Sequence, residues 1–117
     1  PMESVRSKLS QGGAIDSRAL ETMRNGKTVT VGGLVTVRQR PATAGGTIFL
    51  LLEDEFGYMN IVVPQQLVGP NEEVVKRAPF VLVQGRVEND GASISIVGRR
   101  FMELEVEKLT HQAHEFR

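Results

Sequence analysis

The sequence contains no cysteine and no tryptophan, and aromatic residues make up only 5% of its 117 positions. The absence of cysteine excludes a disulfide scaffold, thiol catalysis and a cysteine-ligated zinc site. The two histidines, His111 and His114, lie within the last seven residues, which excludes a histidine-based catalytic site in the core. No apolar run approaches the roughly 18–20 residues of a membrane span, and the start is not a signal peptide. We therefore expect a cytoplasmic domain with no membrane partner, no small-molecule substrate and no metal or other cofactor.

Net charge is also absent, since fourteen Lys and Arg balance fourteen Asp and Glu. A free-standing nucleic-acid binder is usually basic, because neutralised phosphates supply most of its affinity. The charges are nevertheless unevenly distributed: residues 27–46 carry three cations and no acid, whereas residues 53–55 are all acidic. We expect any nucleic-acid binding to be modest and sensitive to salt.

Length and composition favour one globular domain, because hydrophobic residues make up 40% of the chain and charged residues 24%. Pro1 before Met2 is typical of a cloning remnant, so we expect one piece of a larger protein, with a naturally separate protein as the alternative. We predict a lead-in over residues 1–13, an N-terminal helix over 14–26, a barrel over 27–104 and a tail over 105–117. Asp16 is the expected N-cap of the first helix, and Asn25-Gly26 its end.

Alternation of apolar and polar residues predicts five strands, at residues 28–38, 47–54, 58–63, 80–88 and 93–97. Glycines inside two of them, Gly32-Gly33 and Gly85, predict bulges or sharp bends. Asn71 and the charge order of residues 72–77 predict a short helix between the third and fourth strands. We expect Glu53, Asp54 and Glu55 to form a solvated hairpin end, and Arg99 and Arg100 to follow the fifth strand.

Three strands, a helix and two more strands is the order of the five-stranded Greek-key barrel called the OB-fold. An SH3-like barrel is the competing interpretation, but it lacks a helix-bearing connection after the third strand. We therefore predict an all-β OB-fold with short helices. Such barrels bind oligonucleotides on the face of strands two and three and with the loops between strands one and two and strands four and five.

Several segments resemble the OB-fold domain near the C-terminus of bacterial error-prone DNA polymerases, which are C-family enzymes similar to the DNA polymerase III alpha subunit. The resemblance covers about residues 16–117 and is most specific in the block Arg38-Gln39-Arg40-Pro41 with the glycine loop that follows. It implies a part in DNA replication and repair by translesion synthesis, in association with the nucleoid. The chain resembles the accessory domain of these polymerases and not the catalytic one, and we expect no catalytic residue in it.

Candidate nucleic-acid contacts follow from residue type and position. Arg38 and Arg40, two residues apart at the end of the first strand, are suited to clamp phosphates or stack on bases. Phe49 and Tyr58 lie on the two strands that carry stacking aromatics in OB-folds, and Tyr58 is expected to be the more exposed. Thr43 lies in the glycine loop, and Arg99 would extend a basic rim. For each of these the alternative is an exposed or buried residue with no ligand.

Two functions remain open from the sequence. The first is a non-catalytic module that binds single-stranded DNA template for a translesion polymerase, with the contacts named above. The second is a protein-docking module that recruits another translesion-synthesis protein and barely touches DNA. Zero net charge and few aromatics favour the second, whereas the arginine block and the resemblance favour the first.

Overall fold

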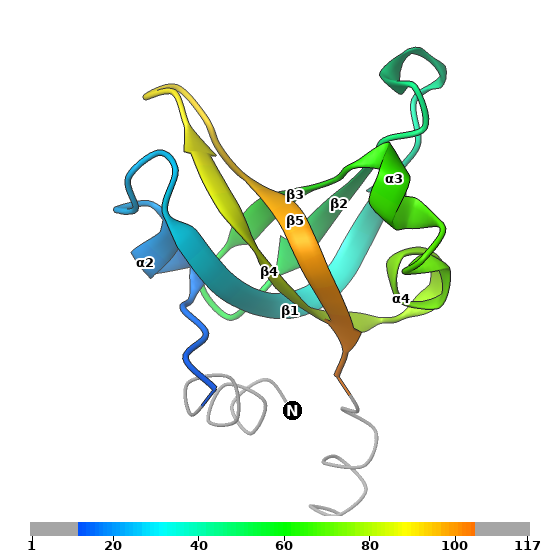
Figure 1. The fold of residues 1–117 in the computed structure, drawn as a ribbon. Coiled ribbons are helices and arrows are strands. Elements are labelled where there is room, and N and C mark those ends of the chain that lie inside the picture. Colours follow the sequence, from blue (N-terminus) through cyan, green and yellow to red (C-terminus); the bar gives the residue numbers. More distant parts are fainter. Residues whose placement is uncertain (1–11, 105–117) are drawn as a thin grey trace, which may run out of the picture.

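The first strand, β1 (Thr28–Gln39), is long enough to pair with two neighbours, and the barrel closes around it (Figure 1). Figure 1 shows a computed structural model, which describes residues 12–104. The other strands are β2 (Ile48–Glu53), β3 (Tyr58–Val63), β4 (Phe80–Asn89) and β5 (Ile94–Glu103). Three short helices join them: α2 (Ser17–Leu20) precedes β1, and α3 (Gln65–Val68) and α4 (Glu72–Arg77) lie between β3 and β4.

Strand pairing produces a closed barrel in the order β1-β2-β3-β5-β4. Residues 28–34 of β1 pair with β4 and residues 34–39 pair with β2, while β3 and β5 run parallel to each other. The helical connection between β3 and β4 distinguishes this arrangement from an SH3-like barrel. The prediction of an all-β OB-fold with short helices is confirmed.

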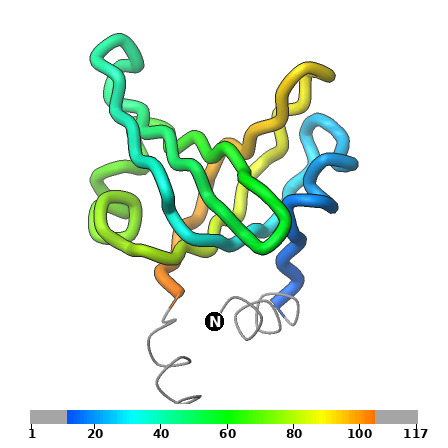
Figure 2. Tube along the Cα trace, turned by 180° about the vertical axis from the view of Figure 1, so that it is seen from behind, coloured from blue at the N-terminus to red at the C-terminus, as the bar shows by residue number. Residues whose placement is uncertain are grey.

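The core fills the barrel from every strand, and a helix contributes to it at each side. Val31, Leu52, Ile61 and Ile96 are fully buried or nearly so, while Leu20 of α2 and Val75 of α4 join the same cluster. The helices α2 and α4 lie on opposite sides of the barrel in both views (Figures 1 and 2). Each is too short to be stable alone, so its helical form depends on this packing.

Glycines mark the two places where backbones approach most closely. An added Cβ at Gly33 would lie 2.6 Å from the carbonyl oxygen of Glu53, at the point where β1 changes partners. Of the two predicted alternatives at Gly32-Gly33, a bulge or a sharp bend, the bulge is not found there, because the register shift of β1 falls between Val35 and Val37. At Gly85 the bulge is confirmed by a register shift between Gln84 and Gly85.

The fifth strand is longer than its alternation predicted. It continues from Ile94 to Glu103, and Gln84 of β4 pairs with Arg100. Arg99 and Arg100 therefore lie within β5 and not after it, which corrects the prediction. The alternation breaks at residues 98–100 because the bulge opposite Gly85 inserts Arg99 as an extra residue.

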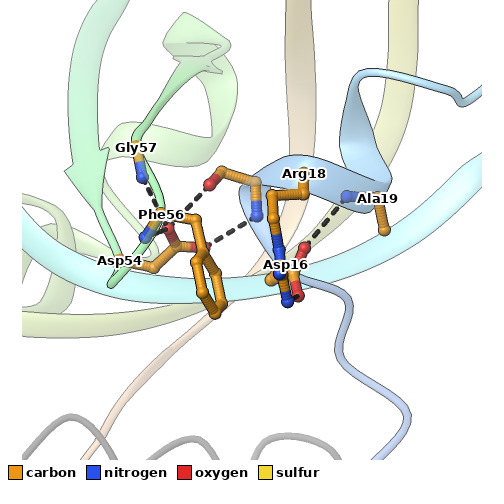
Figure 3. A network of polar contacts seen from close by, with 7 residues as sticks. Asp16, Arg18, Ala19, Asp54, Phe56 and Gly57 are labelled. Carbon is orange, nitrogen blue, oxygen red and sulfur yellow. Dashed lines mark hydrogen bonds and ion pairs between the residues drawn. The ribbon is translucent and has the colours of Figure 1, made fainter.

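A buried carboxylate fastens α2 to the β2–β3 turn (Figure 3). Asp54 is 6% exposed and accepts hydrogen bonds from the Ser17 backbone N–H and hydroxyl, both at 2.7 Å. It also accepts from the backbone N–H groups of Phe56 and Gly57 at 2.9 and 3.1 Å. The expected solvated hairpin end is wrong at Asp54, because these donors replace the water that an exposed carboxylate would bind.

The start of α2 follows the sequence prediction, but its predicted end at Asn25-Gly26 is wrong: the helix ends at Leu20, and Gly26, with φ 89°, belongs to a separate turn before β1. Asp16 is the N-cap, and its carboxylate accepts from the Ala19 N–H at 2.9 Å and from the Arg18 guanidinium at 3.1 Å. Hydrogen bonding by Ala19, helped by Arg18, holds the pKa of Asp16 below its ordinary value of 3.8. The Arg18 guanidinium stacks over the Phe56 ring at 3.5 Å, which adds a second contact across the same junction.

In residues 12–104 no helix is long and apolar enough to cross a membrane. Within that range no three His, Asp or Glu side chains are grouped as a metal site would need. The predicted tail over residues 105–117, including His111 and His114, and most of the predicted lead-in lie outside the described residues.

Candidate nucleic-acid interface

The outer face of β1, β2 and β3 carries apolar side chains that the barrel leaves uncovered. Directly paired residues on neighbouring strands point to the same side of a sheet. Two outward rows therefore cross the barrel, Gln39–Phe49–Val62–Val97 and Val37–Leu51–Asn60–Ser95. Phe49 is 39% exposed and Val37 is 40% exposed, so this outer stripe is open to a ligand.

The two candidate aromatic residues lie apart on this face. Tyr58 pairs with Glu53, four residues along β2 from Phe49, which separates the two positions by about 13 Å. Tyr58 is 60% exposed, which confirms that it is the more open ring. A nucleic acid would therefore meet two separate rings and not one continuous stack.

Two loops project beside this face, one on each side of the molecule (Figure 2). The β1–β2 loop, residues 40–47, contains a 3-10 turn at Ala42–Ala44, and its Gly45 and Gly46 have positive φ angles of 63° and 94°. Thr43 is exposed in that turn. The β4–β5 loop, residues 90–93, forms the other projection.

A groove of about 440 Å³ lies between α2, the start of β3 and the β4–β5 loop. None of the described residues that line it is a cation, and Glu21 contributes a carboxylate; the lining is Ser17, Leu20, Glu21, Tyr58, Met59, Asn89, Gly91, Ala92, Ser93 and Ile94. Asp90 adds a second acid in the adjoining loop, where backbone N–H groups of Ser93 and Ala92 lower its pKa and keep it ionised. The described lining of this groove therefore offers phosphate no cation.

Arg38 is engaged with the protein itself. Its Nε donates to the Val75 carbonyl oxygen at 2.8 Å, and a terminal nitrogen donates to the Ala78 carbonyl oxygen. Those carbonyls lie at the C-terminal end of α4, where backbone acceptors lack helical partners and a cation is favoured. Burial lowers the pKa of Arg38 from its ordinary value, and the guanidinium stays charged.

Arg40 lies beyond the end of β1, where the β1–β2 loop begins. It lines a cavity of about 180 Å³ between the end of β1 and α4, together with Arg38, Gln39, Ile48, Val75 and Lys76. Lys76 is a cation of this cavity that sequence reasoning missed. The helix dipole already accounts for a lysine in the last turn of α4, so no sequence pattern assigned it a binding role. Only the docking of α4 places Lys76 beside the same cavity as Arg40.

Arg99 lies near the same end of the outer face. The row from Gln39 ends at Val97 on β5, and Arg99 follows two residues later as the exposed residue of the bulge. Arg40 follows Gln39 at the other end of that row. Arg40 and Arg99 thus belong to the end of the barrel near α3 and α4, whereas Tyr58 lies at the far end beside the groove.

Comparison with known proteins gives the same family as the resemblance. The chain is 39% identical over 107 residues, 92% of its length, to the error-prone DNA polymerase of Caulobacter vibrioides. It is 42% identical over 97 residues, 83% of its length, to the error-prone DNA polymerase of Nocardia farcinica. The chain is homologous to one segment of the bacterial error-prone DNA polymerases. It spans about 10% and 8% of the length of these two error-prone polymerases, and no protein-family model matches it.

Solved structures similar to this chain share its fold. Asparaginyl-tRNA synthetase from Pyrococcus horikoshii, complexed with asparaginyl-adenylate, superposes with a TM-score of 0.66 at 23% identity, over 78% of this chain and 22% of that one. The protein ygiW from E. coli gives 0.62 at 19% identity, over 80% and 92% of the two chains. The Stn1-ten1 complex of S. pombe gives 0.53 at 16% identity, over 77% and 67%.

Proposed function

We propose that this domain binds single-stranded DNA for an error-prone polymerase and holds the template during translesion synthesis. It performs no chemistry of its own, and it acts in the cytoplasm at the nucleoid, where the polymerase meets its template. The observation that carries the proposal is the uncovered apolar stripe on the outer face of β1–β3, with Phe49 at its centre. In OB-folds that face and its two flanking loops are the oligonucleotide surface.

The physical mechanism combines stacking with phosphate neutralisation. Phe49 offers a ring face to a base, and Val37 and Leu51 extend the apolar surface that a base covers. Arg99 lies beside this stripe, and Arg40 lies past its edge on the side of β1 that faces α4. Thr43 with the glycines of the β1–β2 loop offers a hydroxyl and backbone N–H groups to the sugar-phosphate chain. Tyr58 provides a second ring where the strand leaves the stripe. Because the chain has zero net charge, affinity is modest and depends on salt.

Phe49→Ala tests the stacking contact. We expect it to weaken binding of a fluorescent single-stranded oligonucleotide by about 5- to 150-fold, because one aromatic–base stack contributes about 1–3 kcal/mol. Phe56→Ala is the matched control, since Phe56 is also exposed, at 46%, but lies on the β2–β3 turn under Arg18. Fluorescence anisotropy at low and moderate salt measures both variants. Equal losses in the two variants would contradict the assignment of the site.

Protein docking is the second candidate. The same stripe is mostly aliphatic, and the groove beside Tyr58 has an acidic residue and no cation in its lining. These features fit a module that recruits another component of the damage-tolerance complex. Absence of single-stranded DNA binding at low salt by the folded domain would decide for docking.

A further inference from the structure

Three cations from two separate elements meet at the end of the barrel that α4 covers. Arg38 and Arg40 come from the end of β1, and Lys76 comes from α4, and all three line the cavity of about 180 Å³. Glu72 is the nearby acid: Lys76 donates to it at 2.9 Å, and Arg40 also acts electrostatically on it. Three positive charges against one negative charge leave a surplus of two at this cavity.

Arg38 holds the two elements that line the cavity together. Because its guanidinium is bonded to the Val75 and Ala78 carbonyls, it joins the end of β1 to the end of α4. That link holds the last turn of α4, which contains Lys76, against the end of β1 from which Arg40 extends. The cavity is therefore formed by a contact that is internal to the protein.

The direction of Arg40 separates this cavity from the apolar stripe. Arg38 pairs with Leu50, which is buried inside the barrel, whereas Gln39 pairs with Phe49 on the outside. Arg40 is two residues beyond Arg38 and lines the same cavity, on the side of β1 that faces α4. A nucleic-acid strand lying on Phe49 would reach Arg40 and Lys76 only by passing over the end of β1.

We propose that Arg40 and Lys76 form a subsite for one phosphate group, positioned by Arg38, at the junction of the β1–β2 loop and α4. The bound phosphate replaces the Glu72 carboxylate as the anion that accepts from Lys76. It also accepts hydrogen bonds from the Arg40 guanidinium. The subsite rests on the proposed function for its natural ligand, a phosphodiester of single-stranded DNA. It implies that the strand leaves the apolar stripe over β1, toward α4.

Neighbouring cations on α4 provide a matched pair of variants. Lys76 and Arg77 each form an ion pair with the acid four residues before, at 2.9 and 3.1 Å, but only Lys76 lines the cavity. Lys76→Gln and Arg77→Gln therefore remove the same charge and the same kind of helix contact. Circular dichroism of both variants verifies that the fold is retained.

The test is the salt dependence of single-stranded DNA affinity, measured by anisotropy for the wild type and both variants. Lys76→Gln should reduce the slope of log K against log salt by about 0.7 and weaken binding about fivefold at 0.1 M salt, the share of one phosphate contact. Arg77→Gln should leave both values unchanged. Equal slopes in the two variants, with the wild type binding DNA, would overturn the subsite and leave the proposed function intact.

A second measurement applies if the wild type binds no single-stranded DNA. Inorganic phosphate is then titrated into the ¹⁵N-labelled chain and followed by NMR. Shifts of the amides of residues 38–40 and 75–76 that Lys76→Gln abolishes would support a phosphate subsite whose source is not single-stranded DNA, so that only the proposed function fails. Absence of those shifts would overturn the subsite as well.

Discussion

The two sides of the barrel are each covered by a short helix that a single charged side chain holds in place. On the α2 side the charge is an acid, Asp54, which accepts four hydrogen bonds from the chain. On the α4 side it is a base, Arg38, which donates to two carbonyl groups. In both cases the sign of the charge matches the backbone groups that lack a partner. The acid accepts from free N–H groups of a helix and a turn, and the base donates to free carbonyl groups at a helix end.

The difference lies in what each side leaves for another molecule. Around Asp54 the donors come from the protein, and the neighbouring groove contains Glu21 and no cation among its described lining residues. Around Arg38 two further cations, Arg40 and Lys76, face a small cavity. A buried charge that is hydrogen-bonded internally supports the fold, whereas a hydrogen-bonded cation with two further cations and one acid beside it also prepares a site for an anion.

Asp54→Ala should have the largest effect on stability. The substitution leaves the Ser17 N–H and hydroxyl buried without their acceptor and removes the link between α2 and the β2–β3 turn. We expect the free energy of unfolding to fall by about 3 kcal/mol. Urea denaturation measures the loss, and Glu88→Ala, an exposed acid on β4, is the control with an expected change within about 0.5 kcal/mol. If Asp54→Ala weakened DNA binding and left stability unchanged, the structural role given to Asp54 would be wrong.

Arg38→Ala should cost less stability but affect binding as well. Removing the guanidinium leaves two helix carbonyls without a donor, and we expect a loss of about 2 kcal/mol in unfolding free energy. Arg38→Lys separates positioning from direct contact, because lysine keeps the charge but cannot donate to both carbonyls in a fork. If Arg38 positions α4, both variants weaken single-stranded DNA binding. Full affinity in Arg38→Lys would show that the charge alone matters.

The smallest expected effect is the contribution of Asp16, the N-cap of α2, to the pH dependence of stability. The folded chain lowers the pKa of Asp16 below 3.8, so ionised Asp16 stabilises the fold above about pH 4, and this contribution is lost as the pH falls through the folded value. Asp16→Asn keeps an N-cap of similar quality without the charge. Urea denaturation at pH 3 and pH 6 should show a smaller decrease for Asp16→Asn than for the wild type. An equal decrease would assign the pH dependence to other carboxylates.

Local chemistry made much of the fold predictable. The β2–β3 hairpin has the predicted third strand at Tyr58–Val63, because a short alternating run between Gly57 and Pro64 has few other stable arrangements. Asp16 caps α2 as expected, since capping involves only residues three apart in the chain. The bulge at Gly85 was also predictable, because a glycine within a β-branched run has few other uses.

Predictions that required knowledge of a distant partner were wrong or incomplete. Gly33 does not carry the β1 bulge, because it is needed where the Glu53 carbonyl approaches. β5 continues past its alternating residues as far as Glu103, because β4 residues as far as Val81 pair with it. Asp54 is buried because α2 lies over it, 37 residues away in the sequence.

By itself the sequence determined the number and order of the strands, the helical connection, the family and the types of residue available for binding, because these depend on short-range periodicity and residue identity. Only the tertiary structure decided how those residues are used. Arg38 binds helix carbonyls and Lys76 lines the same cavity as Arg40, because the docking of α4 on the barrel brings together residues that are tens of positions apart. Each such contact depends on where two elements dock, which no local pattern contains.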